Sequence, residues 1–89
     1  MTFTVLLHPK AAKELKKTEK NVQDRIIERA KELRESPEKI GKPLHQSNFW
    51  STRIGDYRVI YQINPQENQV IILFIGHTSK VYDDFSKML

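Results

Sequence analysis

The chain has 89 residues, no cysteine and a formal net charge of +4. This length predicts one small domain over residues 1–89, and the absence of cysteine excludes a disulfide framework and a thiolate site. The longest apolar run, Val70 to Ile75, is far shorter than a membrane span. The N-terminus also lacks the pattern of a signal peptide. We therefore expect a cytoplasmic protein without a membrane partner.

The positive charge is concentrated in the first half of the chain. Residues 1–45 contain 11 Lys and Arg against 7 Asp and Glu, whereas residues 46–89 contain 4 of each kind. One interpretation is that helices expose Lys and Glu to water. The other is a basic collar that attracts an anionic polymer such as RNA. The composition is compatible with both interpretations.

The first half predicts one strand followed by two helices. Residues 3–7 are apolar and β-rich, and Pro9 suits the first turn of a helix that runs to about Thr18. Asn21 is a candidate N-cap for a second helix, which ends near Pro37 because proline disfavours helix at the preceding residue. The apolar stripe that predicts this second helix consists of Val22, Ile26, Ala30 and Leu33.

The second half predicts a loop and three strands. Residues 38–47 contain glycine and proline and are expected to form the loop. The three strands are predicted over residues 48–54, 57–63 and 69–76. The order β-α-α-β-β-β indicates an α+β fold in which both helices cover one face of the sheet. The pattern leaves open which edge the first strand joins.

Trp50 to Tyr61 is the most informative segment for function. Arg53 lies just before the predicted turn and Arg58 just after it, so both belong to neighbouring strands. Forked arginine donors suit a phosphate, and the rings of Trp50 and Tyr57 offer stacking surfaces for unpaired bases. The segment therefore indicates a seat for a phosphodiester, although a single tryptophan is also a natural anchor of a small core.

Two further residues are candidates near the last predicted strand. His77 follows that strand directly, and histidine exchanges protons near neutral pH, which suits a general acid or base. Lys80 would supply another cation, or is simply solvated. The histidines show no metal-ligand spacing and no cysteine assists them, so we expect neither a metal nor a cofactor.

Three segments resemble the RelE/ParE superfamily of bacterial and archaeal toxins. They are LRESP (residues 33–37), RIGDYRVIY (residues 53–61) and IGHTSKVY (residues 75–82). The second is fairly specific, because Gly-Asp-Tyr-Arg between two strands is a family hallmark. The resemblance covers nearly the whole chain. It implies a RelE-like fold, with two N-terminal helices packed on a twisted, mainly antiparallel four-stranded sheet.

The resemblance is greatest to RelE-like members, and it implies a type II toxin that cleaves mRNA on the ribosome and is blocked by a cognate antitoxin. In that metal-independent reaction the ribose 2′-oxygen attacks the adjacent phosphorus. By resemblance, Arg58 clamps the phosphate, Arg53 binds phosphate or favours 2′-deprotonation, and Tyr82 stacks on a base or orients the 2′-hydroxyl. The predicted catalytic residues are thus Arg58, Arg53, His77 and Tyr82, and the predicted RNA contacts are Lys80, Trp50 and Tyr57.

Besides Gln46, which replaces a glycine common in the family's loop, two positions depart from the family pattern. Thr78 stands where many relatives have arginine, and Ser51 stands near a position where strongly active relatives carry lysine. The implied site therefore has fewer cations than the strongest ribonucleases. Either His77 and Lys80 compensate, or the reaction is slow, or the chain acts in another way. A ParE-like inhibitor that binds DNA gyrase without catalysis would tolerate both departures.

Overall fold

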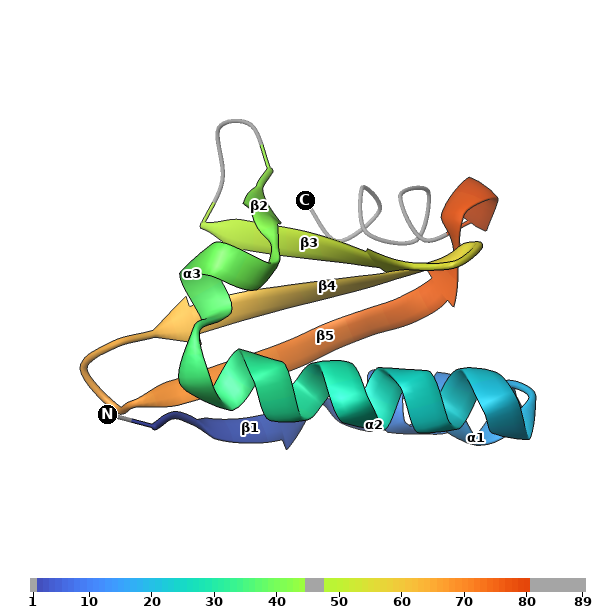
Figure 1. Ribbon diagram of the computed structural model, residues 1–89, viewed down its shortest axis with the longest axis horizontal. Coiled ribbons are helices and arrows are strands. Elements are labelled where there is room, and N and C mark those ends of the chain that lie inside the picture. Colours follow the sequence, from blue (N-terminus) through green and yellow to red (C-terminus); the bar gives the residue numbers. More distant parts are fainter. Residues whose placement is uncertain (1, 45–47, 81–89) are drawn as a thin grey trace.

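The computed structural model describes residues 2–44 and 48–80 of the chain. Its strands form one sheet in the order β1-β5-β4-β3-β2, and α2 lies in front of this sheet in Figure 1. The α+β class and the order of the predicted elements are confirmed. The elements are β1 (Thr4–Leu7), α1 (Pro9–Lys17), α2 (Lys20–Glu35), α3 (Pro37–Ile40), β2 (Lys42–Pro43), β3 (Phe49–Ile54), β4 (Tyr57–Asn64) and β5 (Gln69–His77).

The predicted loop over residues 38–47 is wrong in part, and the sheet has five strands rather than four. Pro37 begins the short helix α3, as its fixed backbone favours at the first helical position. Lys42 and Pro43 then pair with Ser51 and Trp50 as β2. Proline is tolerated in β2 because this strand lies at the sheet edge. Residues 45–47 lie outside the described part.

The structure resolves the position of the first strand. β1 joins β5 in parallel, with Thr4 opposite Gln69 and Leu7 opposite Ile72, whereas the other strand pairs are antiparallel. β1 therefore forms one edge of the sheet and β2 forms the other. Within the described residues, no helix is long and apolar enough to cross a membrane.

The second helix begins one residue before the predicted cap. Lys20 is its first residue, and Glu19 occupies the cap position without a side-chain hydrogen bond. The Asn21 side chain instead accepts from the N–H of Val22, at 2.9 Å. Gln23 stabilises the short connection between α1 and α2, because its Nε2 donates to the carbonyl oxygens of Leu15 in α1 and Thr18 in the turn.

The two faces of the sheet bury different amounts of apolar surface. The main core lies between the sheet and the helices, where Ile26 and Leu33 of α2 pack against strand residues such as Val59. The opposite face holds a smaller cluster built on Ile60 and Phe74. Successive strand residues point to opposite faces. Arg58 and Gln62, which each lie two residues from Ile60 in β4, therefore belong to this second face.

Tyr61 connects the core to the segment that carries β2. Its ring is fully buried, and its hydroxyl donates to the Pro37 carbonyl at 2.7 Å. A Cβ atom added to Gly41 would collide with this hydroxyl and approach the Ser51 carbonyl to 2.7 Å. Burial raises the pKa of Tyr61 to about 12, although a hydrogen bond with the Gly41 backbone and the charge of Arg29 act in the opposite direction.

We expect Tyr61→Phe to change how stability depends on alkaline pH. The folded pKa of about 12 lies above the unfolded value of about 10, so the contribution of Tyr61 is complete below pH ~10 and is lost as pH rises towards ~12. Urea unfolding should show the wild type losing about 2 kcal/mol more than the variant across this window. Equal pH dependence of the free energy of unfolding in the two proteins would contradict this assignment.

At neutral pH, Tyr61→Phe should lower the free energy of unfolding by about 1–3 kcal/mol, because the Pro37 carbonyl loses a buried partner.

Candidate functional site

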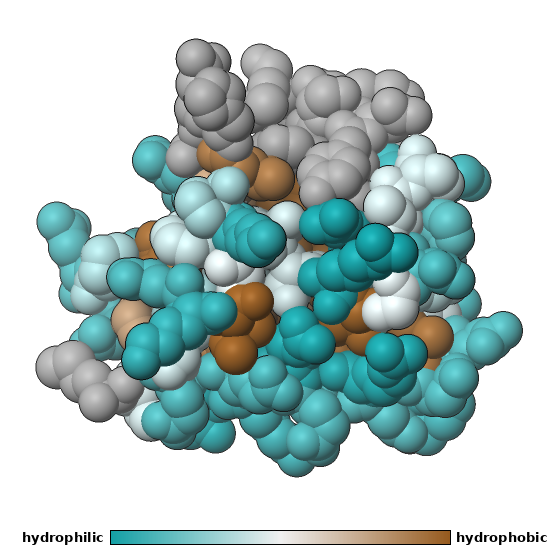
Figure 2. Space-filling model, turned by 45° about the horizontal axis from the view of Figure 1, so that its top comes forward, coloured by the Kyte–Doolittle hydropathy of each residue, from teal (hydrophilic) through white to brown (hydrophobic). Residues whose placement is uncertain are grey.

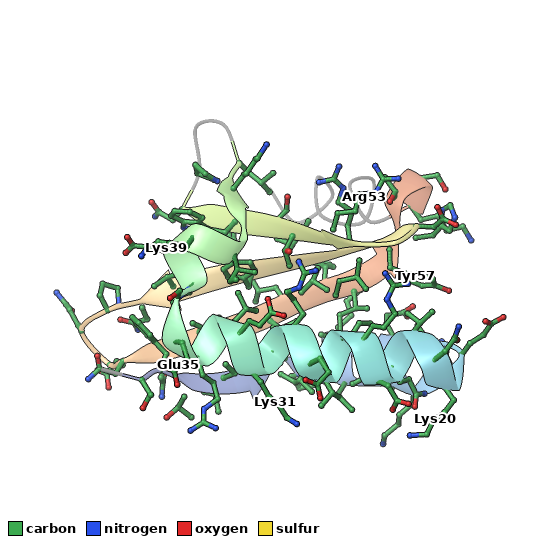
Figure 3. The ribbon with its side chains drawn as sticks, viewed as in Figure 1. Lys20, Lys31, Glu35, Lys39, Arg53 and Tyr57 are labelled. Carbon is green, nitrogen blue, oxygen red and sulfur yellow. The ribbon has the colours of Figure 1, made fainter. Side chains whose placement is uncertain are left out.

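The β3–β4 hairpin brings the two predicted phosphate ligands together. Arg53 pairs directly with Arg58 across the strands, and directly opposed residues share one face of a sheet. The next pair on this face is Ser51 with Ile60, and Ile60 belongs to the cluster on the face away from the helices. Figure 3 agrees, since Arg53 lies away from α2 whereas Tyr57 lies on the side of α2.

The hairpin turn holds one of these guanidinium groups. Arg53 is exposed, and its Nε donates to the Gly55 carbonyl at 2.8 Å. Gly55 has a φ of 59°, a left-handed conformation that glycine adopts at little cost. The Asp56 carbonyl accepts from both the N–H and the hydroxyl of Thr78, each at 2.8 Å. Thr78 thus fastens the turn to the end of β5.

A cleft beside this pair gathers further positive charge at the edge of β3, next to its pairing with β2. It has a volume of about 340 Å³, and we call it the edge cleft. Arg29 enters it from α2 and Lys42 from β2, and sequence reasoning named neither of them as a site residue. No carboxylate lines this cleft among the described residues. Its lining consists of Arg29, Ile40, Gly41, Lys42, Ser51, Thr52, Arg53 and Arg58.

His77 and Tyr57 lie together, but on the other face. They are opposed across β4 and β5, and their rings meet edge to face with centroids 6.0 Å apart. Tyr57 also pairs with Ile54, a residue of the core beneath the helices. The Nδ1 atom of His77 lies 3.0 Å from the Ser79 hydroxyl. The structure therefore does not bring His77 or Tyr57 to the face that carries the arginines.

A β-bulge explains this separation. Ile60 pairs with Phe74 but the adjacent Tyr61 pairs with Ile72, so Leu73 is an extra residue in β5. An extra residue reverses the alternation of side chains beyond it. Without the bulge, His77 would point to the same face as the arginines. No local signal in the sequence marks this bulge, which is why strand alternation alone misplaces His77.

The remaining predicted residues have separate positions. Trp50 stacks on Tyr61 with ring centroids 6.5 Å apart and packs against the main core, which favours its interpretation as a core anchor. Lys80 is exposed in the helical turn after β5. Tyr82 lies outside the described residues. Residues 2–44 and 48–80 contain no group of three His, Asp or Glu side chains that could hold a metal ion.

A family model described as the ParE toxin of the type II toxin–antitoxin system parDE matches residues 5–82. The chain belongs to the RelE/ParE family. It is thus a toxin of the type II toxin–antitoxin class, as the sequence resemblance implied. Toxin RelG of Mycobacterium tuberculosis is 31% identical to it over 85 residues, which cover 92% of this chain and 98% of that toxin.

Solved structures of this toxin family share the fold. The toxin–antitoxin complex RelBE2 from Mycobacterium tuberculosis contains a chain with a TM-score of 0.81 and 30% identity, covering 86% of this chain and 99% of that one. A mutant of E. coli toxin RelE in the free state reaches 0.82 at 23% identity, covering 100% and 99%. The predicted RelE-like architecture is therefore confirmed, with one more strand than expected.

We expect Arg53→Gln to stabilise the domain at low ionic strength. Like charges placed directly opposite in a sheet destabilise it, so the free energy of unfolding should rise by about 0.2–1 kcal/mol. The gain should shrink as NaCl screens the repulsion, which urea unfolding at low and high salt would measure. Lys13→Gln, which removes an exposed cation of α1, is the control for net charge. If both substitutions changed the free energy of unfolding equally, repulsion between Arg53 and Arg58 would not contribute to stability.

Proposed function

We propose that this toxin is a metal-independent endoribonuclease that inhibits translation by cleaving mRNA at the ribosome. The observation that carries the proposal is the Arg53–Arg58 pair, held on one face of the sheet at a cleft that, among the described residues, is lined by cations and by no carboxylate. The family membership and the likeness to toxin RelG and to the RelBE2 toxin chain support it. Two fixed guanidinium groups suit a phosphate that becomes more negative during reaction.

The proposed reaction uses charge stabilisation as its main contribution. The ribose 2′-oxygen forms a bond to the adjacent phosphorus, the bond to the 5′-oxygen breaks, and a proton passes from the first oxygen to the second. Arg58 is half-buried, and its Nε is buried, so its charge acts with less screening than an exposed one. Arg53 is oriented by the Gly55 carbonyl. Such preorganised donors need no rearrangement as charge develops.

Proton transfer and base stacking are assigned to the residues at the hairpin end and beyond. His77 remains the proposed general acid or base, and Tyr57, which contacts its ring, remains a proposed RNA contact together with Lys80. Trp50, also predicted as an RNA contact, is better explained as a core anchor by its packing on Tyr61. Tyr82 keeps its proposed role at the 2′-hydroxyl or a base by resemblance. RNA that reaches both His77 and the arginines has to pass around the β3–β4 turn, because they lie on opposite faces of the sheet.

We expect Arg58→Ala to reduce the rate of mRNA cleavage on ribosomes by about 10²- to 10³-fold, as loss of one oxyanion donor does in other enzymes. Primer extension after in-vitro translation measures the breaks. Arg58→Lys should recover part of the rate because it keeps the charge but not the fork. Lys13→Gln is the matched control and should cleave like the wild type.

The alternative, a non-catalytic inhibitor of DNA gyrase, is kept because the matching family model is named for ParE toxins. This alternative predicts intact mRNA in the primer-extension experiment and inhibited supercoiling in an assay with DNA gyrase. Intact mRNA together with inhibited supercoiling by the wild type would replace the ribonuclease proposal. Wild-type rates of cleavage by Arg58→Ala would instead show that the proposed site is wrong.

We also propose that a cognate antitoxin binds an apolar groove at the opposite edge of the sheet, because several related toxins were solved in complex with antitoxins. Leu7 and Ile27 are 43% and 46% exposed there, and Lys31 and Arg34 stand at its polar margin. An amphipathic segment with acidic flanks would match this surface. The groove has a volume of about 210 Å³ and is lined by Val5, Leu7, Leu15, Ile26, Ile27, Ala30, Lys31, Arg34 and Ile72.

We expect Ile27→Asp to weaken antitoxin binding about tenfold or more, since the burial of one large apolar side chain is lost. Isothermal titration calorimetry with the cognate antitoxin measures the affinity. Ribosomal mRNA cleavage should be unchanged, because the groove and the edge cleft lie at different edges. Asp24→Asn, on the same helix but outside the groove, should bind antitoxin normally. An unchanged affinity of Ile27→Asp would exclude the groove as the antitoxin site.

A further inference from the structure

We propose that Arg29 and Lys42, together with Arg53, form a second phosphate site. This site would receive the phosphate next to the cleaved one along the RNA chain. The inference rests on the proposed ribonuclease function and adds two residues to it. The neutral residues Ser51 and Thr78 leave the implied site with fewer cations than in strongly active relatives. Arg29 of α2 and Lys42 of β2 would supply positive charge in their place.

Lys42 stands beside the position where relatives carry lysine. β2 pairs Lys42 directly with Ser51, so both side chains share the face that also carries Arg53. Ser51 and Arg53 are two residues apart on β3, which is about 6.6 Å along a strand. The Lys42 side chain is exposed. Its ammonium therefore extends the charged row of Arg53 and Arg58 towards the sheet edge, past the neutral Ser51.

Arg29 reaches the same place from the helical layer. β2 covers β3 only at Trp50 and Ser51, so within the described residues the edge of β3 beyond Ser51 is not paired with another strand. Arg29 uses this opening, and its Nη1 donates to the Thr52 hydroxyl at 2.6 Å and to the Arg53 carbonyl at 3.4 Å. The guanidinium is thereby held at a defined position at the edge of β3, where its Nε also lies 3.7 Å from a carboxylate oxygen of Glu32.

The backbone of β3 adds a donor to the same cleft. The Leu44 N–H donates to the Phe49 carbonyl, so Phe49 directs its main-chain groups towards the β2 edge. Main-chain groups of alternate strand residues point to the same side, and Arg53 therefore presents its N–H at this edge as well. An oxyanion in the edge cleft would meet this N–H together with the side chains of Arg29 and Lys42.

The size and the charge of the edge cleft favour a polyanion over a single small ion. Its volume of about 340 Å³ lies at the lower end of the range of about 300–1,000 Å³ for ligand sites, which suits a phosphate with its sugar. On the face that Figure 2 displays, strongly hydrophilic side chains lie among neutral and apolar ones. Because the cleft is continuous with Arg58, one RNA strand can occupy both phosphate positions.

The test compares Lys42→Gln with the wild type on two probes. One is a dinucleotide with a single phosphodiester, and the other is a trinucleotide with two, both with 2′-deoxy sugars that prevent cleavage. Binding is followed by NMR titration at several salt concentrations. For the trinucleotide we expect Lys42→Gln to weaken binding about two- to fivefold and to lower the slope of log K against log salt by about 0.7. The dinucleotide should bind both proteins equally.

Two controls keep the second site separate from the proposed function. Lys39→Gln removes an exposed cation of α3 that does not line the cleft, and it should bind both probes like the wild type. Arg29→Lys keeps the charge but loses the fork, and should weaken trinucleotide binding. Equal trinucleotide affinities of Lys42→Gln and the wild type would overturn the second site, even where Arg58→Ala abolishes mRNA cleavage. A Lys42→Gln protein that binds RNA normally but antitoxin weakly would reassign the cleft to an acidic protein segment.

Discussion

Two guanidinium groups face the same side of the sheet because Arg53 and Arg58 occupy directly opposed positions of β3 and β4. This arrangement brings two like charges together, and like charges that lie directly opposite in a sheet repel each other. It persists because the opposite face of the same hairpin is buried, with Ile54 and Val59 packed in the main core. The core thus holds in place the pair of charges that we propose as a phosphate site. In such a site, the stability of the fold and the affinity for a phosphate are opposed.

The shortness of β2 shapes the rest of the site. Tyr61 holds the start of α3 through the Pro37 carbonyl, and Gly41 passes close to its hydroxyl, so the chain reaches β3 at a defined position. Within the described residues, β2 then pairs with two residues of β3, Ser51 and Trp50. A longer strand would cover the edge of β3 and exclude Arg29 from it. The edge cleft therefore depends on the late start of β2, at Lys42, and on one buried tyrosine.

The sheet order separates the two proposed binding surfaces. The apolar groove lies at β1 and the edge cleft lies at β2, which are the opposite edges of the five-stranded sheet. An antitoxin anchored in the groove reaches the cations only by extending across or around the toxin. If the antitoxin also contacts the cations, its anchoring and those contacts would be carried by different segments, and substitutions would weaken one without the other.

Local pattern alone determined the two long helices, the long strands and the opposed arginines. The two-residue turn at Gly55 and Asp56 sets the register of its hairpin, so the pairing of Arg53 with Arg58 follows from residues adjacent in the chain. Only the tertiary structure decided that β1 lies parallel to β5, that the bulge at Leu73 turns His77 to the other face, and that Arg29 and Lys42 join the cleft. These features depend on packing between segments that are distant in sequence. Hydrophobic periodicity and turn residues predict local structure only, so they do not predict such contacts.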